Sequence, residues 1–461
     1  MLAGEQKNPP DPGFWTETSL IQLGYGIWVN SGMIIIGFAF GFLAVAIPQL
    51  RSPDSQIKVT VSDESWIASV VTLVSPIGCV LGGYLIDKFG RRCMLIYGQL
   101  PVCLGWFYTG FARSANDIMI GGITTGIGMG IIMSVPRVYL MEISLPNMRG
   151  VLGSFANIAI SIGITAQAGL GSIFKWSTLC YINSAFSLTL FVLNFGLPET
   201  PYYLLKTSVE RAKASLKRIR SKKYNIAAEM DKLIEFKREN DIHKLSFKEQ
   251  LLILFKKSTC KAFWLIVTYM FIMQCSGVTV VAMWTVEMLK NSKSSVDAHV
   301  GNVILGFTRV VGGICTSVLM FKLRRRVMAL SSGLGVGTAC ILLCFLIKEA
   351  KQPTVVPLIL YVVYILSATL GHYTLPVLMM NELYPLQVRG LLGGISSSSL
   401  NVIISGANWA YPHSRDSIGF ANTILCFGVC SLAGCVFLYI FLPETKGLTL
   451  QQTEAYYKSK H

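Results

Sequence analysis

Two segments of this sequence repeat the same charged residue types at the same spacing. The first runs from Glu142 to Arg149 and the second from Glu382 to Arg389, with a proline between acid and base and a glycine after the arginine. A carboxylate and a guanidinium at a partly shielded helix end form directional, charge-assisted hydrogen bonds. Such pairs can hold neighbouring helices together and separate when the helices move. The repeat therefore predicts a two-state contact, and static pairing of helix ends is the alternative.

A third charged segment, Gly82–Arg92, lies between two long apolar runs and carries the acid Asp87 and the base Arg91. On its own, such a turn can be a positively charged loop that only sets topology. Because the two repeated segments also carry acid–arginine pairs, we expect all three segments to form a gate at one end of a helix bundle. The expected gate residues are Asp87, Arg91, Glu142, Arg149, Glu382 and Arg389.

The composition indicates an integral membrane protein. The chain has 461 residues, of which 52% are hydrophobic and 14% charged, whereas soluble domains carry roughly 25% charged residues. Apolar runs of about 20 residues are long enough to cross a bilayer as helices. The net charge of +16 could indicate nucleic-acid binding, but the bases lie between the apolar runs, so orientation in the bilayer explains them better. We expect a lipid bilayer and no nucleic acid as partner.

No residue pattern indicates an enzyme or a metal protein. No nucleophile–base arrangement is evident, His372 is the one histidine deep in an apolar run, and neither a CxxC nor a His-rich spacing occurs. We therefore expect no catalysis, no cofactor and no metal.

Twelve apolar runs are predicted to be membrane-spanning helices in two groups of six. They are Trp28–Leu50, Trp66–Ile86, Met94–Ala112, Ile118–Met141, Val151–Ile173, Leu179–Leu197, Ala262–Val286, Val300–Phe321, Val327–Ile347, Val355–Met379, Leu391–Ala410 and Phe420–Leu442. The predicted division is an N-terminal segment 1–27, a six-helix half 28–198, a helical linker 199–261, a second half 262–442 and a tail 443–461.

The basic residues predict the orientation. They gather in the loops after the second, fourth, sixth and eighth runs and are sparse in the opposite loops, so the basic loops and both termini are expected to be cytoplasmic. The linker between the halves is then cytoplasmic too. Ala212, Leu216 and Ile219 share one helical face, and Ile226 to Arg238 forms a second amphipathic piece, which predicts surface helices beneath the bundle.

A second repeat supports duplication of a six-helix unit. The sixth run ends in Leu197-Pro198-Glu199-Thr200 and the twelfth in Leu442-Pro443-Glu444-Thr445. Duplicated transporter folds place the substrate near the bilayer midplane between the halves, which rock to give alternating access.

These motifs resemble the sugar-porter family of the major facilitator superfamily, and the details look most like arthropod facilitated trehalose transporters. The similar segments are Gly83–Arg92, Pro136–Glu142 with Arg149-Gly150, Pro198–Leu204 and Pro443–Gly447. The resemblance implies an all-α membrane protein with twelve transmembrane helices in two six-helix halves, the major facilitator fold, with cytoplasmic amphipathic helices between the halves. It also implies a small-molecule sugar as partner.

The resemblance places the substrate site mainly on the seventh helix. Gln274 and Thr279 are the expected direct contacts, although Thr279 replaces the family's asparagine, and Trp284 is the expected gate or stacking face. Asn157 stands where the fifth helix would offer a glutamine, and Asn401 is a candidate on the eleventh. Each polar residue has an alternative role in a hydrogen bond between helices.

Several positions depart from the family. Met273 replaces a glutamine, Val377 replaces a tryptophan on the tenth helix, and Gly122 stands where an arginine is usual. In the second half, Phe321 and Arg324 replace the acid and glycine of the loop, which predicts stronger closing interactions in the first half.

Arg309 lies well inside the eighth apolar run, where the family has an amide facing the cavity. A charge inside a membrane span is costly and indicates function. Arg309 is therefore a candidate to hydrogen-bond sugar hydroxyls or to favour an anionic substrate; the alternative is that it snorkels or pairs with a polar neighbour.

No acid lies near Leu43 on the first helix, where proton-coupled sugar porters tend to place one. Proton coupling needs a titratable group along the path, so the sequence predicts passive uniport. The predicted function is facilitated diffusion of a neutral sugar, trehalose or a hexose, across the plasma membrane, with a monomer as a plausible assembly. The alternatives are a transporter of another, possibly anionic, solute and a sugar sensor that does not transport.

Overall fold

The computed structural model describes residues 16–145, 148–222, 224–242, 253–349, 352–384 and 388–444, and in these ranges the regular structure is helical throughout. The N-terminal half contains α1 (Glu17–Asn30), α2 (Gly32–Leu50), α3 (Val61–Phe89), α4 (Arg91–Tyr97), α5 (Gln99–Gly110), α6 (Ala115–Ile143), α7 (Arg149–Gly171), α8 (Trp176–Leu193) and the 3-10 turn η1 (Asn194–Gly196). The linker contains α9 (Pro201–Leu204), α10 (Val209–Ile219) and α11 (Ile226–Ile242). The C-terminal half contains α13 (Lys257–Cys275), α14 (Val278–Met283), α15 (Thr285–Asn291), α16 (Ala298–Lys322), α17 (Arg325–Glu349), α18 (Val356–Leu370), α19 (Leu375–Leu383), α20 (Arg389–Ile418) and α21 (Phe420–Phe441).

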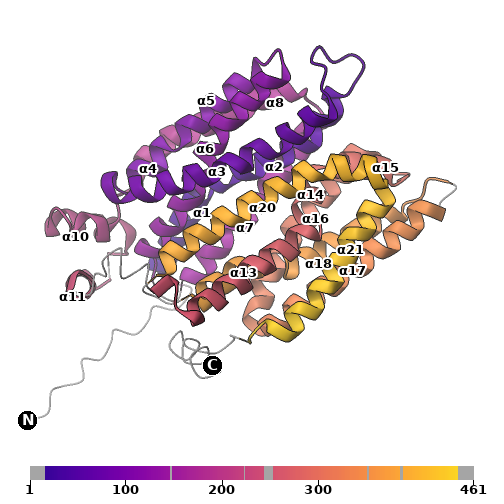
Figure 1. Cartoon of the computed structure of the whole chain (residues 1–461). Helices are drawn as coiled ribbons and strands as arrows, with labels where there is room; N and C mark the ends of the chain where they lie inside the picture. The colour runs from indigo at the N-terminus through magenta and orange to yellow at the C-terminus, as the bar shows by residue number, and fades with distance from the viewer. Residues whose placement is uncertain are drawn as a thin grey trace, which may run out of the picture.

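The predicted arrangement of two six-helix halves is confirmed. Ten helices or joined helices in the described residues are long and apolar enough to cross a membrane, and Thr259–Cys275 is a shorter apolar helix. Four of the twelve spans are broken into successive helices: α1–α2, α4–α5, α13–α15 and α18–α19. Figure 1 shows the N-terminal half in indigo to magenta and the C-terminal half in rose through orange to yellow.

Two of these breaks follow directly from the residues present. Gly277 separates α13 from α14 with φ +80°, a conformation that other residues rarely adopt, and a Cβ there would lie 2.6 Å from the Phe427 ring. The bend expected around Pro376 is also present, because α18 ends at Leu370 and α19 starts again at Leu375. Both breaks interrupt the helices near the middle of the bundle, as in transporters that bind solute at unwound helices.

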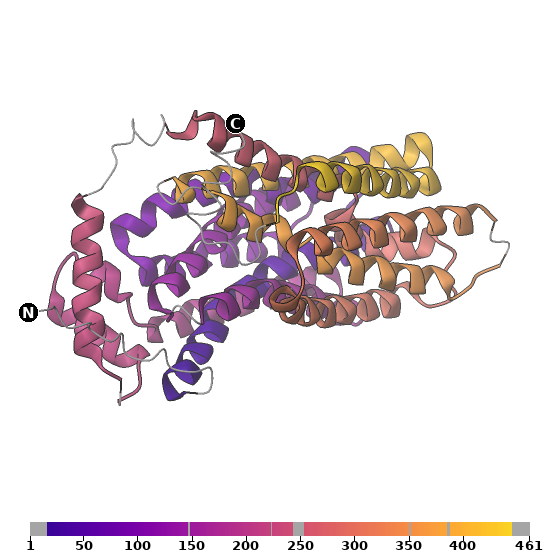
Figure 2. The same ribbon diagram turned by 90° about the horizontal axis from the view of Figure 1, so that it is seen from below.

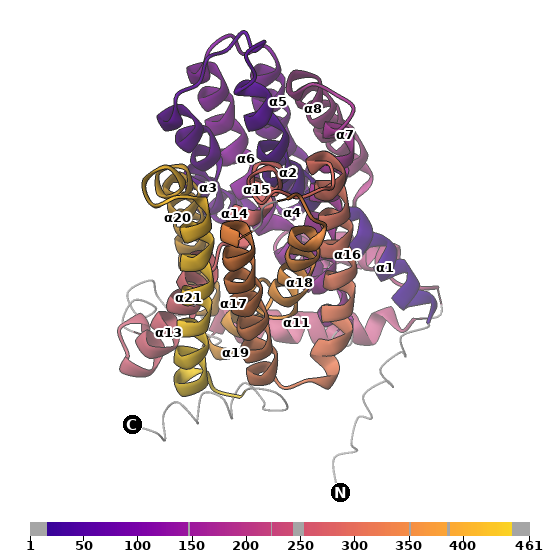
Figure 3. The same ribbon diagram turned by 90° about the vertical axis from the view of Figure 1, so that its right-hand side faces the viewer.

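Small residues allow helices within the N-terminal half to pack closely. A Cβ on Gly37 of α2 would lie 2.1 Å from the Ile160 carbonyl oxygen of α7, and a Cβ on Gly130 of α6 would lie 2.1 Å from the Ser75 carbonyl oxygen of α3. Such contacts replace hydrophobic association as the cohesive force between helices in lipid. The halves meet along two helix pairs, α3 with α20 and α7 with α16, and Figure 3 shows α14 and α15 at their junction.

The amphipathic linker helices are confirmed. Ala212, Leu216 and Ile219 of α10 are all buried, and they belong to one apolar cluster with Tyr139 and Leu197 of the bundle. Helices α10 and α11 lie across one end of the bundle (Figure 2). We call this the linker end, and the opposite end, which carries the loop after α2 and the end of α20, the distal end.

Some helix ends differ from those predicted. Helix α1 starts at Glu17, before the predicted Trp28, because the Thr16 hydroxyl caps the helix by accepting from the Ser19 N–H. Helix α20 continues beyond the predicted Ala410 to Ile418. The predicted N-terminal segment up to residue 15 and the tail from residue 445 lie outside the described residues.

Candidate functional site

A buried arginine anchors a charge cluster at the linker end of the N-terminal half. The Arg91 side chain pairs with Glu142 of α6, with Nη2 2.7 Å and Nε 2.9 Å from Oε1. The other Glu142 oxygen accepts from the Thr200 hydroxyl at 2.5 Å. Asp87, whose side chain is 71% exposed, lies 3.4 Å from the same guanidinium. Three of the predicted gate residues are thus brought together, and Thr200 joins them.

Glu199 completes this cluster by capping a helix. Gly90 ends α3 with φ +96°, so α4 begins at Arg91 and leaves its first N–H groups without helical acceptors. The Glu199 carboxylate accepts from the N–H groups of Arg91 and Arg92 at 3.1 to 3.2 Å. Burial raises the pKa of the Glu199 carboxyl above its usual range, opposed by the backbone hydrogen bonds from Thr200, Arg92 and Arg91.

The C-terminal half repeats this cluster with Glu382, a predicted gate residue, and with Arg325 and Glu444, which were not predicted as gate residues. Arg325 pairs with Glu382 at 3.2 Å, and Glu444 accepts from the N–H groups of Arg325 and Arg326 at 3.0 and 3.2 Å. Arg325 therefore corresponds to Arg91, and Glu444 to Glu199. The sequence-based reasoning counted Arg325 only as an orientation signal, although its place in the second half matches that of Arg91.

One predicted gate residue does not join these clusters in the described part of the chain. Arg149, at the start of α7, is exposed and makes no ion pair with any side chain in the described ranges. The side chains of Arg389 and Phe321 lie outside the described residues. Both observed clusters are internal to one half, since Arg91 pairs with α6 and Arg325 with α19.

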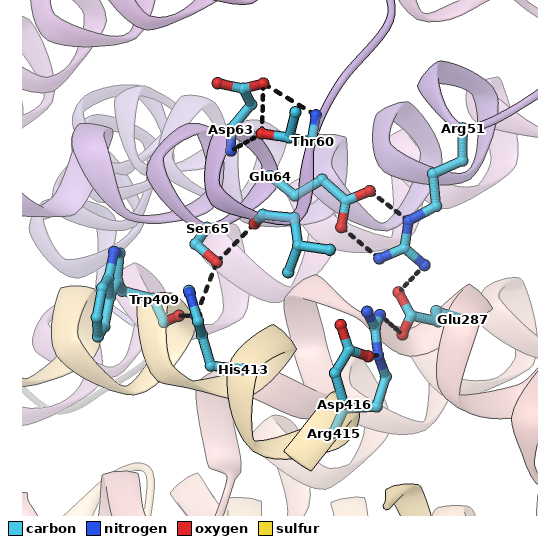
Figure 4. Close-up of polar contacts among 11 residues, drawn as sticks. Arg51, Thr60, Asp63, Glu64, Ser65, Glu287, Trp409, His413, Arg415 and Asp416 are labelled. Atoms are coloured by element: carbon cyan, nitrogen blue, oxygen red, sulfur yellow. Dashed lines mark hydrogen bonds and ion pairs between the residues drawn. The ribbon is translucent and has the colours of Figure 1, made fainter.

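The distal end holds a charge network that the sequence-based reasoning missed (Figure 4). Arg51, just after α2, makes two hydrogen bonds to Glu64 of α3 and reaches Glu287 of α15 at 3.0 Å. Arg415 of α20 pairs with the other oxygen of Glu287 at 2.5 Å and with Asp416 at 2.7 Å. Because Arg51 belongs to the N-terminal half and Glu287 to the C-terminal half, this network joins the halves.

Two neutral hydrogen bonds join the halves near the same end. The Ser405 hydroxyl of α20 donates to the Ser69 carbonyl oxygen of α3 at 3.0 Å, and the Ser65 hydroxyl lies 3.3 Å from His413 Nδ1. Among the described residues, every hydrogen bond and ion pair between the halves lies at the distal end. The sequence does contain acids and bases near the helix ends on this side of the bundle, and these opposite charges could have predicted the network.

The structure brings together two of the predicted substrate residues. The Thr279 hydroxyl donates to Gln274 Oε1 across the break at Gly277, and both side chains are buried, while Gln274 Nε2 has no partner. Trp284 is buried beside Tyr411, with ring centroids 5.0 Å apart, and its indole N–H is also unpaired. Unpaired buried donors are rare, which makes this stretch suited to a ligand with hydroxyl groups.

Two predicted amide contacts form no hydrogen bond with this stretch in the described residues. Asn401 is buried, and its Nδ2 donates to the Ser397 carbonyl oxygen of its own helix at 3.1 Å. Asn157 is half-buried on α7. A glutamine that the sequence-based reasoning passed over, Gln167, is fully buried on α7, and neither of its side-chain polar atoms has a partner.

Arg309 lies on α16 in the seam between the two halves. One turn to either side, Gly306 and Gly313 face Thr165 and Ile158 of α7. Arg309 is 7% exposed, and its Nη2 has no hydrogen-bond partner. A charge at mid-membrane depth costs roughly 2.5 to 3.5 kcal/mol, so this guanidinium is held there against an energetic penalty.

A small apolar cavity lies where the first, second, third and fourth spans meet. Its lining includes Leu43, Gly122, Trp106 and Met283, and contains no acid, base or histidine. It encloses about 30 Å³, which is space for little more than a water molecule, and apolar cavities of this kind stay dry. Two of these lining residues stand at positions that the sequence analysis singled out. No acid lies near Leu43, and Gly122 stands where an arginine is usual.

Comparisons with known proteins agree with this architecture. Residues 20–457 match the family model described as "Sugar (and other) transporter". The facilitated trehalose transporter Tret1 of Apis mellifera ligustica is 27% identical over 447 residues, covering 94% of this chain and 88% of that protein. The protein of the same name from Bombyx mori is 27% identical over 449 residues, covering 94% and 86%.

Solved structures show the same fold. The inward-open conformation of the xylose transporter XylE from E. coli superimposes with a TM-score of 0.77 at 18% identity, covering 94% of this chain and 99% of that chain. The proton:xylose symporter XylE bound to 6-bromo-6-deoxy-D-glucose gives 0.75 at 18% identity, covering 95% and 100%. On the family match, the chain belongs to the family of sugar (and other) transporters, and it shares its fold with XylE, a transporter of the major facilitator superfamily.

Proposed function

We propose that this membrane protein carries a neutral sugar, trehalose or a hexose, across the plasma membrane by passive uniport. Its relatives include facilitated trehalose transporters, and Gln274, Thr279 and Trp284 offer amide, hydroxyl and aromatic groups at the broken seventh span. Sugars are recognised by groups of these kinds. Gln167 is a further contact in this proposal because both polar atoms of its side chain are buried and unpaired.

The observation that supports uniport is the apolar cavity around Leu43 and Gly122. The solved relative XylE is a proton:xylose symporter, and coupling to protons requires a titratable group on the path. Helix α2 of this chain contains no acid, base or histidine, and neither does the lining of the cavity beside it. A carrier without such a group equilibrates its solute but does not concentrate it.

In this proposal the linker end faces the cytoplasm, because basic residues are concentrated in its loops. The distal network then serves as the outer gate. It has to open for solute to enter from outside, whereas the two linker-end clusters stay with their own halves as the halves rock. The outer gate is closed in this structure by Arg51, Glu287 and Arg415.

Uptake of labelled trehalose and glucose by cells that lack sugar transport tests this proposal. We expect saturable uptake that reaches equilibrium and does not change with an imposed pH gradient. Accumulation above equilibrium that a protonophore abolishes would refute uniport. Binding without any uptake, by protein shown to be at the cell surface, would favour a sensor.

A further inference from the structure

Two arginines in the membrane-spanning part of the molecule have no acid to balance them. Arg309 lies in the seam between α7 and α16, and Arg137 lies on α6 within the span Ala115–Ile143. Neither forms an ion pair or a side-chain hydrogen bond with the residues that the structure describes. The other arginine pairs described above, at both ends of the bundle, all include a carboxylate.

Tyr373 places the two arginines around a common region. Both guanidinium groups lie within electrostatic range of the Tyr373 hydroxyl. Tyr373 lies in the break between α18 and α19, in the C-terminal half, whereas Arg137 belongs to the N-terminal half. Arg137 must therefore point toward the other half, and its exposed side chain faces the junction at which a transporter of this fold holds its solute.

The neighbours of Arg309 are neutral hydrogen-bonding groups. Tyr364 is the first of them: its hydroxyl lies within electrostatic range of Arg309 and donates to the Ser276 carbonyl oxygen at 2.8 Å, which leaves its oxygen free to accept. The electrostatic neighbours of Arg309 and Arg137 among the described residues are Tyr364, Tyr373 and Cys79, and none is a carboxylate. Two positive charges at one solute site, with no internal counter-charge, are a binding environment for an anion.

We propose that the preferred solute carries an anionic group, a carboxylate or a phosphate, on a sugar-like body. The planar guanidinium of Arg309 suits bidentate binding of either group, and Gln274, Thr279 and Gln167 remain for the hydroxyls. This inference rests on the proposed uniport function and changes one part of it, because the preferred solute becomes a charged sugar in place of a neutral one. It also accounts for the loss of a neutral amide at position 309.

The test uses the full-length protein in liposomes with three labelled probes: glucose, glucuronate and glucose 6-phosphate. We expect saturable uptake of glucuronate or glucose 6-phosphate, or of both, with at least a roughly tenfold higher kcat/KM than glucose. The carboxylate and phosphate arms show which group is accepted. Uptake of glucose alone, without inhibition by either anion, would overturn the inference and leave the proposed function standing, whereas no uptake of any probe by folded, inserted protein would overturn both.

Membrane potential gives a second readout that does not depend on a variant. A carrier returns to its starting state in each cycle, so only the charge of the solute counts at equilibrium. A potential of 100 mV, positive inside, should raise the final accumulation of the glucuronate monoanion roughly 50-fold, and that of glucose not at all. Accumulation of glucuronate that is independent of potential would refute its movement as an uncompensated anion.

Arg309→Gln restores a neutral amide and should lower uptake of the anionic probe at least about tenfold while leaving glucose uptake equal or higher. Arg309→Lys keeps the charge and should retain part of the anion uptake, which separates a loss of charge from a failure to fold. Arg211→Gln is the matched control, because Arg211 is an exposed arginine on α10, and it should leave uptake unchanged. Equal anion uptake by wild type and Arg309→Gln would sink the proposal.

Discussion

At the linker end arginine–glutamate pairs join helices of the same half, whereas at the distal end they join the two halves. Arg91 with Glu142 and Arg325 with Glu382 are internal pairs, while Arg51 with Glu287 crosses the junction. Rigid rocking of the halves leaves internal pairs intact and must break the crossing pair. The same residue types therefore contribute to stability at one end and to the balance between conformations at the other.

The two ends also differ in how they arise. The linker-end clusters are copies of one design. Each has an arginine at a helix start, a glutamate near the end of a later helix of the same half, and a second glutamate that accepts from the backbone N–H of the arginine. The distal network has no such copy among the described residues, since one glutamate, Glu287, receives both Arg51 and Arg415. Duplication explains the first, and the asymmetric junction of the halves explains the second.

The largest expected effect is on stability, at the linker end. Glu142→Ala removes the buried partner of Arg91, whose side chain is 6% exposed, and leaves this buried charge with only the exposed Asp87 as an ionic partner. Breaking such a pair costs about 3 kcal/mol or more. Thermal unfolding of the purified protein in detergent should show a clear loss of stability, with little change in the ratio of inward-open to outward-open molecules.

Asp87→Asn is the matched control, since Asp87 meets the same guanidinium from an exposed position. Exposed pairs contribute about 1 kcal/mol or less. If Asp87→Asn destabilised the protein as much as Glu142→Ala, burial would not be what distinguishes the two partners of Arg91.

The next effect is on conformation, at the distal end. Glu287→Gln removes the carboxylate that both arginines share, and should shift the equilibrium toward distal-open molecules by about 2 kcal/mol, or roughly 30-fold in the population ratio. Spin labels at Asp54 and Ser417, both exposed at that end, report the distance between the halves. A distance distribution identical to that of the protein carrying the labels alone would contradict a latch.

Ser405→Ala provides the comparison at the same junction. It deletes one neutral hydrogen bond, from Ser405 to Ser69, whose net contribution is about 1 kcal/mol. The shift in distance should be smaller than for Glu287→Gln but in the same direction.

A smaller effect separates the two arginines of the network. Arg51 bonds Glu64 and Glu287, whereas Arg415 bonds Glu287 and its exposed neighbour Asp416. Because only Arg51 belongs to the N-terminal half, Arg51→Gln removes the crossing pair and Arg415→Gln does not. We expect Arg415→Gln to shift the label distance less than Arg51→Gln, by about 1 kcal/mol or less in free energy; the reverse order would show that Arg415 holds Glu287 in place for the whole network.

The sequence was sufficient for the fold because bilayer thickness and repeated motifs constrain it strongly. Apolar runs gave the spans, and the paired Glu199 and Glu444 motifs gave the duplication, both of which the structure contains. The break before Pro376 has a local cause that the sequence shows, since proline disrupts a continuing helix, whereas the break at Gly277 was not predicted. Helix ends such as Glu17 and Ile418 were misplaced because capping and tertiary packing set them, not hydropathy.

The site was predicted less completely because contacts between distant segments have no local signal. Gln274 and Thr279, which lie five residues apart in one span, were both predicted as site residues, whereas the contact of Arg51 with Glu287 across 236 positions was not predicted. The sequence alone does not show that Gln167 and Arg325 belong to a site. The structure shows it, because Gln167 is buried with unpaired polar atoms and Arg325 pairs with Glu382. The predicted contacts of Asn157 and Asn401 with solute stay predictions.

The smallest expected effect concerns the pH dependence of the linker-end clusters. Burial raises the pKa of Glu199 in the folded protein, so the folded state binds more protons than the unfolded state between the ordinary glutamate pKa and the raised one. Stability in that window therefore falls as pH rises.

Glu199→Gln removes the titrating group and keeps an oxygen that can accept from Arg91 and Arg92. Thermal unfolding from pH 4 to 8 should show a shallower decline with pH for Glu199→Gln than for wild type. A distal variant, Glu287→Gln, should keep the wild-type contribution of Glu199, since the two carboxylates lie at opposite ends of the bundle. An unchanged slope in Glu199→Gln would contradict a raised pKa and show that the capping hydrogen bonds cancel the effect of burial.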